Sequence, residues 1–420
     1  MNILKPISIS LSPNTEKDDI FLAFKLIFQP WKWKRGEAAE KLENRFKKYF
    51  NFKYAIAFNS GRSSLTAILK SLNVEKESEV LLQAFTCNAA SNPIIWSGLK
   101  SVYVDCDNNF NLDTDDLRKK ITPKSRAIIV QHTFGIPANI GEIAKIAKEN
   151  NLILIEDCAH SLGAKFNNQK IGTFGDVSFF SFSRDKIISS VYGGMIITND
   201  DKLFKRIKNF QEKTSYPSFY WIKQQLIHPI LMNWFILPTY RIFGKYLLIL
   251  LQYIKILSKA VHWKEKKGLM PNYFPKKMPN ALAILALNQF EKIEKFNNHR
   301  KEIADFYFKK LENTCFKLPE APKNSSPVFL RFPIKHSDAH QIIKQSWKNN
   351  LLIGDWYTSP IAPEDTILEK VGYKAGFCPN AESLAKITFN LPTHINISRK
   401  EAQKVVNFLN KYLNKHPIKY

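Results

Sequence analysis

The chain has 420 residues, of which 45% are hydrophobic and 24% are charged, and its formal net charge is +25. This length and composition exclude a disordered chain and are typical of a globular protein with two or three domains. The excess of lysine and arginine is compatible with solubility alone or with an anionic partner. Because no nucleic-acid-binding motif accompanies the charge, we expect a small anionic ligand rather than DNA or RNA.

The cysteines and the N-terminus indicate a cellular compartment. The five cysteines are scattered and form no CxxC pair: Cys87, Cys106, Cys158, Cys315 and Cys378. This spacing argues against a zinc site or a disulfide framework, so no metal site is predicted, and a reducing compartment is favoured. Residues 1–19 lack the apolar core and cleavage site of a signal peptide, so the cytoplasm is the expected location.

The predicted elements begin with a helix over residues 37–50, where apolar positions recur at helical spacing. Short apolar runs predict the strands that follow: 54–60, 79–85, 101–107, 126–135, 152–159, 176–183 and 193–200. Helical stretches, such as residues 61–72 and 139–151, separate several of these runs. The alternation predicts an α/β domain with a mostly parallel sheet that is buried on both faces.

The C-terminal part has a different pattern. A long helix is predicted over residues 280–313, and the last hundred residues mix short strands with helices, which is typical of a smaller α+β domain. The predicted division has four parts: a large cofactor-binding domain over 1–214, an insertion over 215–262, a return of the large domain with the linking helix over 263–300, and a small domain over 301–420.

Three features of the large domain predict a cofactor site. A Ser-Gly turn at Gly61 opens a helix, and free N–H groups at a helix start suit a phosphate. Asp157 ends a predicted strand, where a carboxylate can pair with a protonated pyridine nitrogen. Lys186 lies in a polar loop after an apolar run, where a lowered pKa would let its amine attack a carbonyl. Each feature alone is commonly structural, but together they describe a pyridoxal 5'-phosphate (PLP) site.

The motif around the lysine, IEDCAHSLGAKFNNQKIGTFGDVSFFSFSRDKIISSVYGGMIITND, closely resembles the signature block of the DegT/DnrJ/EryC1/StrS aminotransferases. The resemblance continues in order through FNSGRSSLTAIL, QAFTCNAASNPIIWSGLKSVYVDCD, ITPKSRAIIVQHTFGIPANI, KMPNALAILALNQFEKI and LPTHINISRKEAQKVVNFL. Those proteins are PLP-dependent enzymes of the aspartate-aminotransferase fold (fold type I). Most of them aminate nucleotide-linked keto-sugars.

The resemblance implies a function and roles for individual residues. We expect an aminotransferase that makes an amino sugar for cell-surface glycan or related biosynthesis, with glutamate or glutamine as the amino donor, and that acts as a homodimer with the active site at the interface. Lys186 would bind the cofactor and shuttle protons, and Asp157 would keep the pyridine nitrogen protonated. His160 would lie near the ring and its phenolic oxygen, and Ser181 would bind the phosphate.

The chain departs from the family pattern at several cofactor positions. Gly61 and Arg62 occupy the Ser-Gly-Thr phosphate turn, and Arg62 would either pair with the phosphate or point into the substrate cleft. Cys87 stands where many relatives place an aromatic residue on the ring, and a sulfur can also pack against it. Pro275 and Lys277 occupy the places of an Asn and an Arg in relatives, where the Asn reaches the phosphate of the other subunit, so Lys277 or Arg62 would replace that contact.

Two alternatives to an aminotransferase follow from the same resemblance. Some family members are PLP-dependent sugar dehydratases, but these typically carry His in place of the lysine, and Lys186 is present here. A non-catalytic regulatory protein on the same fold is favoured by the departures at Cys87 and Pro275 and opposed by the intact Lys186, Asp157 and Ser181. Residues 354–361 are the predicted substrate-facing loop.

Residues 215–262 interrupt the family pattern with an apolar and aromatic insertion. Pro229 and Pro238 divide its first half, and basic residues recur through its second half at roughly helical spacing, so neither half meets the requirement for a spanning helix. Two interpretations stay open. The segment is a helical hairpin packed on the core or dimer interface, or it is an interfacial element that contacts anionic lipid. In the second case four aromatic residues would lie at headgroup level: Trp221, Trp234, Tyr240 and Tyr246.

Overall fold

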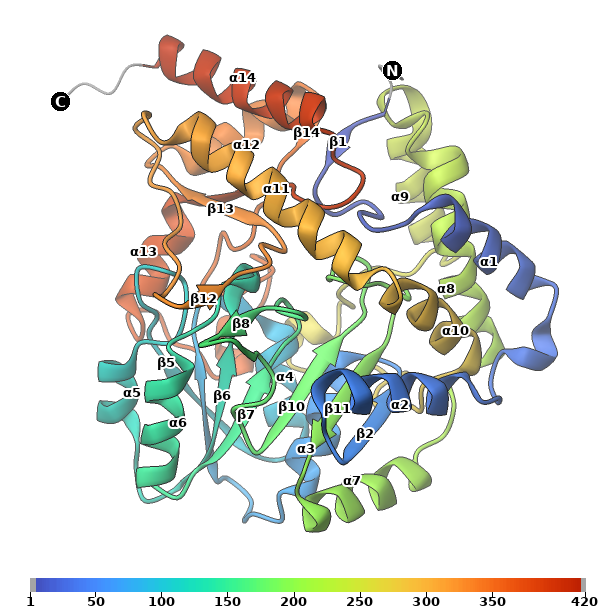
Figure 1. The fold of residues 1–420 in the computed structure, drawn as a ribbon, viewed down its shortest axis with the longest axis vertical. Coiled ribbons are helices and arrows are strands. Elements are labelled where there is room, and N and C mark those ends of the chain that lie inside the picture. The colour runs from blue at the N-terminus through green and yellow to red at the C-terminus, as the bar shows by residue number, and fades with distance from the viewer. Residues whose placement is uncertain (1–4, 417–420) are drawn as a thin grey trace.

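The computed structural model describes residues 5–416, in which a large domain carries a smaller one on top and helices α1, α8 and α9 lie along one side (Figure 1). The large domain is built on a seven-stranded sheet with the order β2-β11-β10-β7-β6-β3-β5. Its strands are β2 (Tyr54–Phe58), β3 (Glu79–Gln83), β5 (Lys100–Val104), β6 (Ser125–Gln131), β7 (Ile153–Asp157), β10 (Val177–Ser181) and β11 (Gly194–Thr198).

All seven predicted strands form, and six of them run parallel. The exception is β11, which pairs antiparallel with both β10 and β2. The apolar pattern could not reveal this direction, because a buried strand looks the same in either orientation. The cause lies in the connection: the chain passes from β10 to β11 through a loop without a crossover helix, and a parallel pair requires such a crossover.

Helices cover both faces of the sheet, and the strands alternate their side chains between two cores. Leu81 of β3 packs in the core beneath one set of helices, whereas its neighbours Val80 and Leu82 pack in the core beneath the other set. The first set is α2 (Ala38–Phe50), α5 (Thr114–Lys120), α6 (Ile140–Glu149) and α10 (Asn280–Phe290). The second set is α3 (Gly61–Ser71), α4 (Asn88–Trp96), α7 (Asp201–Lys213) and α13 (Pro379–Ile387).

The small domain has its own core beneath three helices, α11 (Ile293–Leu311), α12 (Ala339–Lys348) and α14 (Arg399–Lys415). These pack on the antiparallel pair β13 (Phe332–Lys335) and β16 (Thr388–Leu391). The start of the described chain joins this domain, because β1 (Ile7–Ser8) pairs with β14 (Leu351–Leu352). Short strands complete the fold: β4 (Thr86–Cys87) with β15 (Ile361–Ala362), and β8 (Lys165–Phe166) with β9 (Gln169–Lys170) and β12 (Ser325–Ser326).

The single long helix predicted over residues 280–313 is wrong, because the structure has two helices there, α10 and α11. The break lies at Lys292, which has a non-helical conformation at the start of α11. The Lys292 ammonium is held by the carboxylates of Asp18 and Asp19, at 2.7 and 3.0 Å. These carboxylates belong to α1 (Lys17–Ile27), which is far from Lys292 in the sequence. The apolar pattern of residues 280–313 therefore could not reveal this contact.

The predicted insertion forms a bent helical arm. It consists of α8 (Phe219–Leu231), the π-helical turns η3 (Met232–Ile236) and η4 (Tyr240–Gly244), and α9 (Lys245–Tyr253). Within residues 5–416, no single helix is both long and apolar enough to span a bilayer. Residues 219–236 and 240–253 satisfy the length and composition criteria only as a pair, and the two helices are bent by 111°.

Candidate active site

A cavity of about 630 Å³ lies at the carboxyl ends of β6, β7 and β10, where an α/β sheet binds its ligands. All seven residues predicted for the cofactor site line this one cavity: Gly61, Arg62, Cys87, Asp157, His160, Ser181 and Lys186. They come from segments more than a hundred residues apart, so the fold brings them together as the sequence interpretation required. Lys277 and Pro275, predicted near the partner's phosphate, do not line it.

Lys186 is held in a tight turn beyond the end of β10. Its N–H donates to the carbonyl of Ser183 at 3.1 Å, and its own carbonyl accepts from Asn14 Nδ2. Asn14 is in turn fixed by the fully buried Arg300, whose Nη2 donates to Asn14 Oδ1 at 2.5 Å. Burial lowers the pKa of the Lys186 amine, while the neighbouring Asp185 raises it in part. A larger share of this amine is therefore neutral and nucleophilic than of a surface lysine.

Asp157 is the last residue of β7 and is 5% exposed. One carboxylate oxygen accepts from the N–H of Ala159 at 2.9 Å. Burial raises the pKa of Asp157 to about 6, although the Ala159 hydrogen bond and the nearby Lys186 lower it in part. A buried carboxyl with this pKa favours a cationic partner, and a protonated pyridine nitrogen is such a partner.

The start of α3 forms the predicted phosphate cradle. Ser60 is the N-cap, and its Oγ accepts from the N–H of Ser63 at 3.0 Å. The N–H groups of Gly61 and Arg62 precede the first intrahelical hydrogen bond and are available to an anion. A Cβ at Gly61 would lie 3.0 Å from the Cβ of Ser181, so glycine permits the close approach of the helix start to Ser181.

The Arg62 side chain is engaged by groups that the sequence did not indicate. Its Nη1 lies 2.7 Å from a carboxylate oxygen of Glu265, whose side chain is fully buried, and its Nη2 donates to the carbonyl of Ala260 at 2.9 Å. Burial opposes the charge of Arg62, but the Glu265 carboxylate raises the pKa of the guanidinium above its ordinary value. A contact between Arg62 and the phosphate stays a prediction.

His160 and Cys87 lie on the walls of the cavity. His160 Nδ1 accepts from the N–H of Phe134 at 3.3 Å, and burial, with the charges of Lys186 and Arg331, holds the pKa of His160 well below its ordinary value. The ring is therefore neutral. Cys87 is the N-cap of α4, and its Sγ accepts from the N–H of Ala89 at 3.5 Å.

A loop of the small domain supplies the aromatic wall of the cavity. Trp356 stacks on His160 with ring centroids 5.2 Å apart, and the Lys186 Nζ lies 4.7 Å from the Trp356 ring centroid. The buried Arg331 covers the same indole and donates to Asp185 at 3.1 Å. Asp355 to Thr358 line the cavity, within the predicted substrate-facing loop of residues 354–361. Sequence analysis missed Arg331, although an arginine inside the apolar run VFLRFPI was a usable signal.

Lys277 has other contacts within this chain. Its Nζ donates to the carbonyl of Glu212 at 3.1 Å, and its backbone N–H donates to the carbonyl of Ser215. These contacts hold Lys277 beside the end of α7. The predicted cross-subunit role of Lys277 stays a prediction, because it concerns a partner's cavity.

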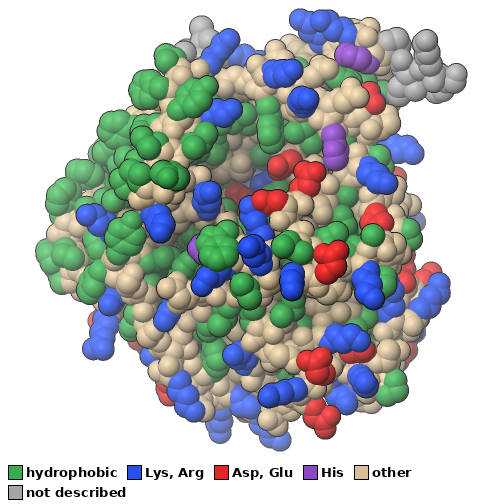
Figure 2. Space-filling model, turned by 180° about the vertical axis from the view of Figure 1, so that it is seen from behind, with side chains coloured by type: hydrophobic (Ala, Val, Ile, Leu, Met, Phe, Trp, Pro, Cys, Tyr) green, Lys and Arg blue, Asp and Glu red, His purple; other side chains and the backbone are tan. Residues whose placement is uncertain are grey.

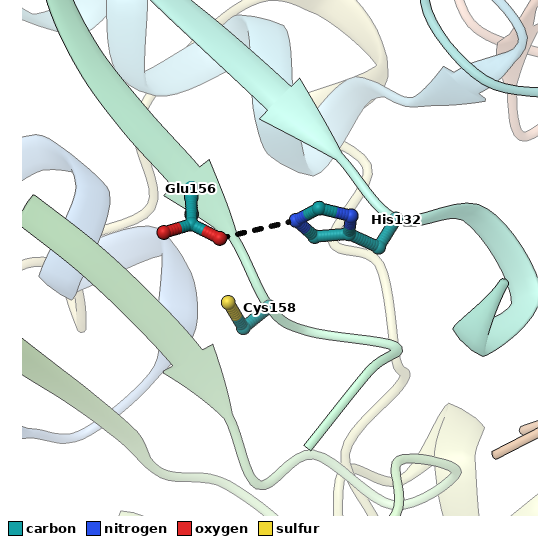
Figure 3. A group of neighbouring side chains, drawn as sticks. All are labelled: His132, Glu156 and Cys158. Atoms are coloured by element: carbon teal, nitrogen blue, oxygen red, sulfur yellow. Dashed lines mark ion pairs between the residues drawn. The ribbon is translucent and has the colours of Figure 1, made fainter. Parts of the chain in front are cut away.

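Three buried side chains beneath the cavity have the composition of a metal site. His132, Glu156 and Cys158 point toward one another from the ends of β6 and β7 (Figure 3), and their potential ligand atoms lie within 4.8 Å of one another. Hydrogen bonds account for two of them. The Glu156 carboxylate accepts from three backbone N–H groups, at Gly172, Phe174 and Gly175. His132 Nδ1 accepts from the N–H of Ala138 at 3.0 Å, which leaves Nε2 to carry the proton toward Glu156. The cluster therefore has a sufficient structural explanation.

The cavity fits PLP on its own geometry. The start of α3 with Ser181 offers hydrogen-bond donors to a phosphate, and Asp157 offers a buried carboxylate to a ring nitrogen. Lys186 offers a buried amine with a lowered pKa in the same cavity. A volume of about 630 Å³ also leaves room for a second molecule beside the cofactor.

The comparisons with known proteins agree with this geometry. The model of the DegT/DnrJ/EryC1/StrS aminotransferase family matches residues 14–226 and 253–410. The chain is 28% identical over 386 residues to GDP-perosamine synthase of Escherichia coli O157:H7, covering 91% of this chain and 92% of the relative. It is 27% identical over 376 residues to the pleiotropic regulatory protein of Geobacillus stearothermophilus, covering 88% of each.

A solved structure shows the same fold. PseC of Helicobacter pylori, described as an aminotransferase involved in the biosynthesis of pseudoaminic acid, superimposes with a TM-score of 0.76 at 20% identity, covering 98% of this chain and 100% of that one. The unmatched residues 227–252 of the family comparison lie inside the predicted insertion.

Proposed function

Because this chain belongs to the DegT/DnrJ/EryC1/StrS aminotransferase family, we propose that it transfers an amino group from an amino acid to a nucleotide-linked keto-sugar. Membership confirms the predicted family, the fold type, the PLP cofactor and the assignment to PLP-dependent aminotransferases. The sugar substrate is the proposal. The likeness to GDP-perosamine synthase supports the sugar substrate, and the placement of Lys186 and Asp157 in one cavity with a helix start that suits phosphate supports the amino transfer.

The residues of the cavity divide the work. When bound, PLP supplies a carbonyl carbon that takes up the amino group and a pyridine ring that accepts electrons. Asp157 accepts a hydrogen bond from the ring nitrogen and holds the proton there. The N–H groups at Gly61 and Arg62 and the hydroxyl of Ser181 bind the phosphate. Lys186 Nζ would hold the cofactor in the resting enzyme and, as a free amine, would remove the proton from the α-carbon of the donor, a task that its lowered pKa favours.

The acceptor would lie beside the small-domain loop. Trp356 and Tyr357 close one side of the cavity, and an apolar wall excludes water from the reacting atoms. Asp185 lines the cavity beside this wall and pairs with Arg331, which covers Trp356. A sugar hydroxyl group suits such a mixed wall, because it needs directional donors and acceptors beside an apolar ring face.

The cofactor spectrum tests the proposal directly. Protein reconstituted with PLP should be yellow, and L-glutamate should bleach it by converting the cofactor to its amino form. A panel of nucleotide-linked keto-sugars is then added to the bleached enzyme, and the active acceptor should restore the yellow colour with formation of one amino sugar per turnover. Bleaching by glutamate without restoration by any keto-sugar would refute the sugar substrate while leaving the aminotransferase class intact.

The same experiment separates the two alternatives. A dehydratase would consume the keto-sugar without a net amino transfer, and Lys186 opposes it as stated above. A regulatory protein, favoured by the likeness to the pleiotropic regulatory protein, would not be bleached by an amino donor. We also propose a homodimer and a cytoplasmic location, the latter supported by five free cysteines.

A further inference from the structure

An unusually large apolar surface lies on one side of the molecule, over α1 and the bent helical arm (Figure 2). We call it the apolar face and define it by its exposed side chains: Phe21, Phe24, Phe28, Trp31, Trp234, Phe235, Ile242, Phe243, Tyr246, Ile249, Leu250 and Tyr253. Tyr253 is 82% exposed, Trp31 70% and Tyr246 69%. Contiguous exposed apolar surface of this kind marks an interaction site.

The two parts of the apolar face form one surface. Trp234 of η3 contacts two rings of α1, with centroid distances of 6.2 Å to Phe21 and 5.6 Å to Phe24. Helix α1 therefore extends the surface of the arm, and no local sequence pattern indicated that these two segments meet.

Helix α9 is apolar on both sides. Leu247, Leu248 and Leu251 pack inward against the small core of the arm. Tyr246, Ile249, Leu250 and Tyr253 recur at spacings of three, four and seven and point outward. A helix that is hydrophobic all round is normally covered by apolar groups on both sides. In this chain the protein covers only the inner side of α9, and the outer side is exposed.

The charge of the arm favours an anionic partner. Residues 215–262 contain no Asp or Glu and five basic residues, all exposed: Lys223, Arg241, Lys245, Lys255 and Lys259. Asp18 and Asp19 of α1 both pair with Lys292 of the protein body. The apolar face is thus bordered by positive charge without a compensating acidic group from the arm.

This charge disfavours a second copy as the occupant. In a two-fold dimer the same surface meets itself, so the basic residues of both arms would approach one another with no acidic partner between them. A spanning arrangement is also disfavoured, because α8 is packed on the protein body through Trp221, Ile222 and Leu226. The arm lies along the protein body, and its outer side faces the solvent.

We propose that the apolar face docks this protein on an anionic lipid bilayer. The aromatic side chains enter the headgroup region and the acyl boundary, and the basic residues of the arm contact anionic headgroups. This inference rests on the surface and does not depend on the sugar substrate.

Docking would place the cofactor cavity beside the bilayer. The segment that follows α9 carries three backbone carbonyls that hold side chains of the cavity wall. The carbonyl of Ser258 accepts from Arg184, that of Lys259 from Tyr192, and that of Ala260 from Arg62. The arm is thus continuous with the cavity wall.

The test is co-sedimentation of the PLP-loaded full chain with vesicles. We expect binding to vesicles of phosphatidylcholine with phosphatidylglycerol at low salt, little binding to pure phosphatidylcholine, and weakening at high salt. Arg241→Gln with Lys245→Gln should lower the partition coefficient about 30-fold, since each basic residue near an anionic surface contributes about fivefold. The matched control, Lys119→Gln with Lys124→Gln, removes the same charge from exposed positions in α5 and in the turn before β6, and should leave binding within about twofold.

A second pair of variants tests the apolar contribution. Tyr246→Gln, Leu250→Gln and Tyr253→Gln together should abolish sedimentation while leaving glutamate bleaching intact. Phe377→Gln changes an exposed aromatic residue just before α13, a helix that lies on the opposite side of the molecule in Figure 1, and should leave sedimentation unchanged. Wild-type protein that stays in the supernatant with anionic vesicles at low salt would overturn the proposal. So would light scattering without lipid in which the triple variant has half the mass of the wild type, because the face would then be a subunit interface.

Discussion

The buried ion pair between Arg62 and Glu265 gives the sharpest prediction about the cavity. We consider Glu265→Gln, which keeps the size of the side chain and removes its charge. The Glu265 side chain is fully buried and that of Arg62 is 12% exposed, so the variant leaves a buried guanidinium without its counter-charge, although the Ala260 carbonyl still accepts from it. Breaking a buried pair from one side costs about 3–5 kcal/mol. We expect that loss in the free energy of unfolding, measured by urea denaturation.

Two control variants test whether the loss of stability comes from the unpaired buried charge. Arg62→Met with Glu265→Leu removes both charges, keeps packing against Phe274 and should recover most of the loss. Glu142→Gln breaks a surface pair with Arg118, which water and salt screen, and should cost far less stability than Glu265→Gln. A loss from Glu265→Gln as small as that of Glu142→Gln would refute the reasoning. The double variant should also retain PLP, and loss of PLP would instead support the predicted contact of Arg62 with the phosphate.

Three further predictions concern the chemistry and assembly of the site. Lys186→Ala should abolish transamination and the cofactor adduct fixed by borohydride, while circular dichroism stays unchanged; normal turnover would disprove the assignment. Asp157 has its pKa raised from 3.8 to about 6 by burial, so the folded state holds this proton more tightly than the unfolded state. The cofactor-free protein should therefore lose about 3 kcal/mol of stability, relative to Asp157→Asn, as the pH rises from about 3 to about 7, and parallel urea midpoints for the two proteins would contradict this. Light scattering should give the mass of two chains, and a fully active monomer at micromolar concentration would count against a shared site.

The sequence by itself determined the features that depend on neighbouring residues. Runs of apolar side chains specify the strands, because burial on both faces of a sheet requires them. Asp157 and Ser181 end such runs, so their position at the ligand-binding edge followed from the strand assignment. Lys186 lies in the loop that follows Ser181 at the end of β10. The amino-acid motif that contains these three residues, residues 155–200, was sufficient to identify the family.

Only the tertiary structure decided which distant groups meet. Arg62 and Glu265 are about two hundred residues apart, and no local pattern joins them. The same is true of His160 with Trp356 and of α1 with the arm, whose contact creates the apolar face. The strand directions of β10 and β11 also required the fold, since apolar periodicity reports burial and carries no information on orientation. Pairings across the molecule depend on how whole elements pack, and that packing minimises exposed surface over the entire chain rather than within any one segment.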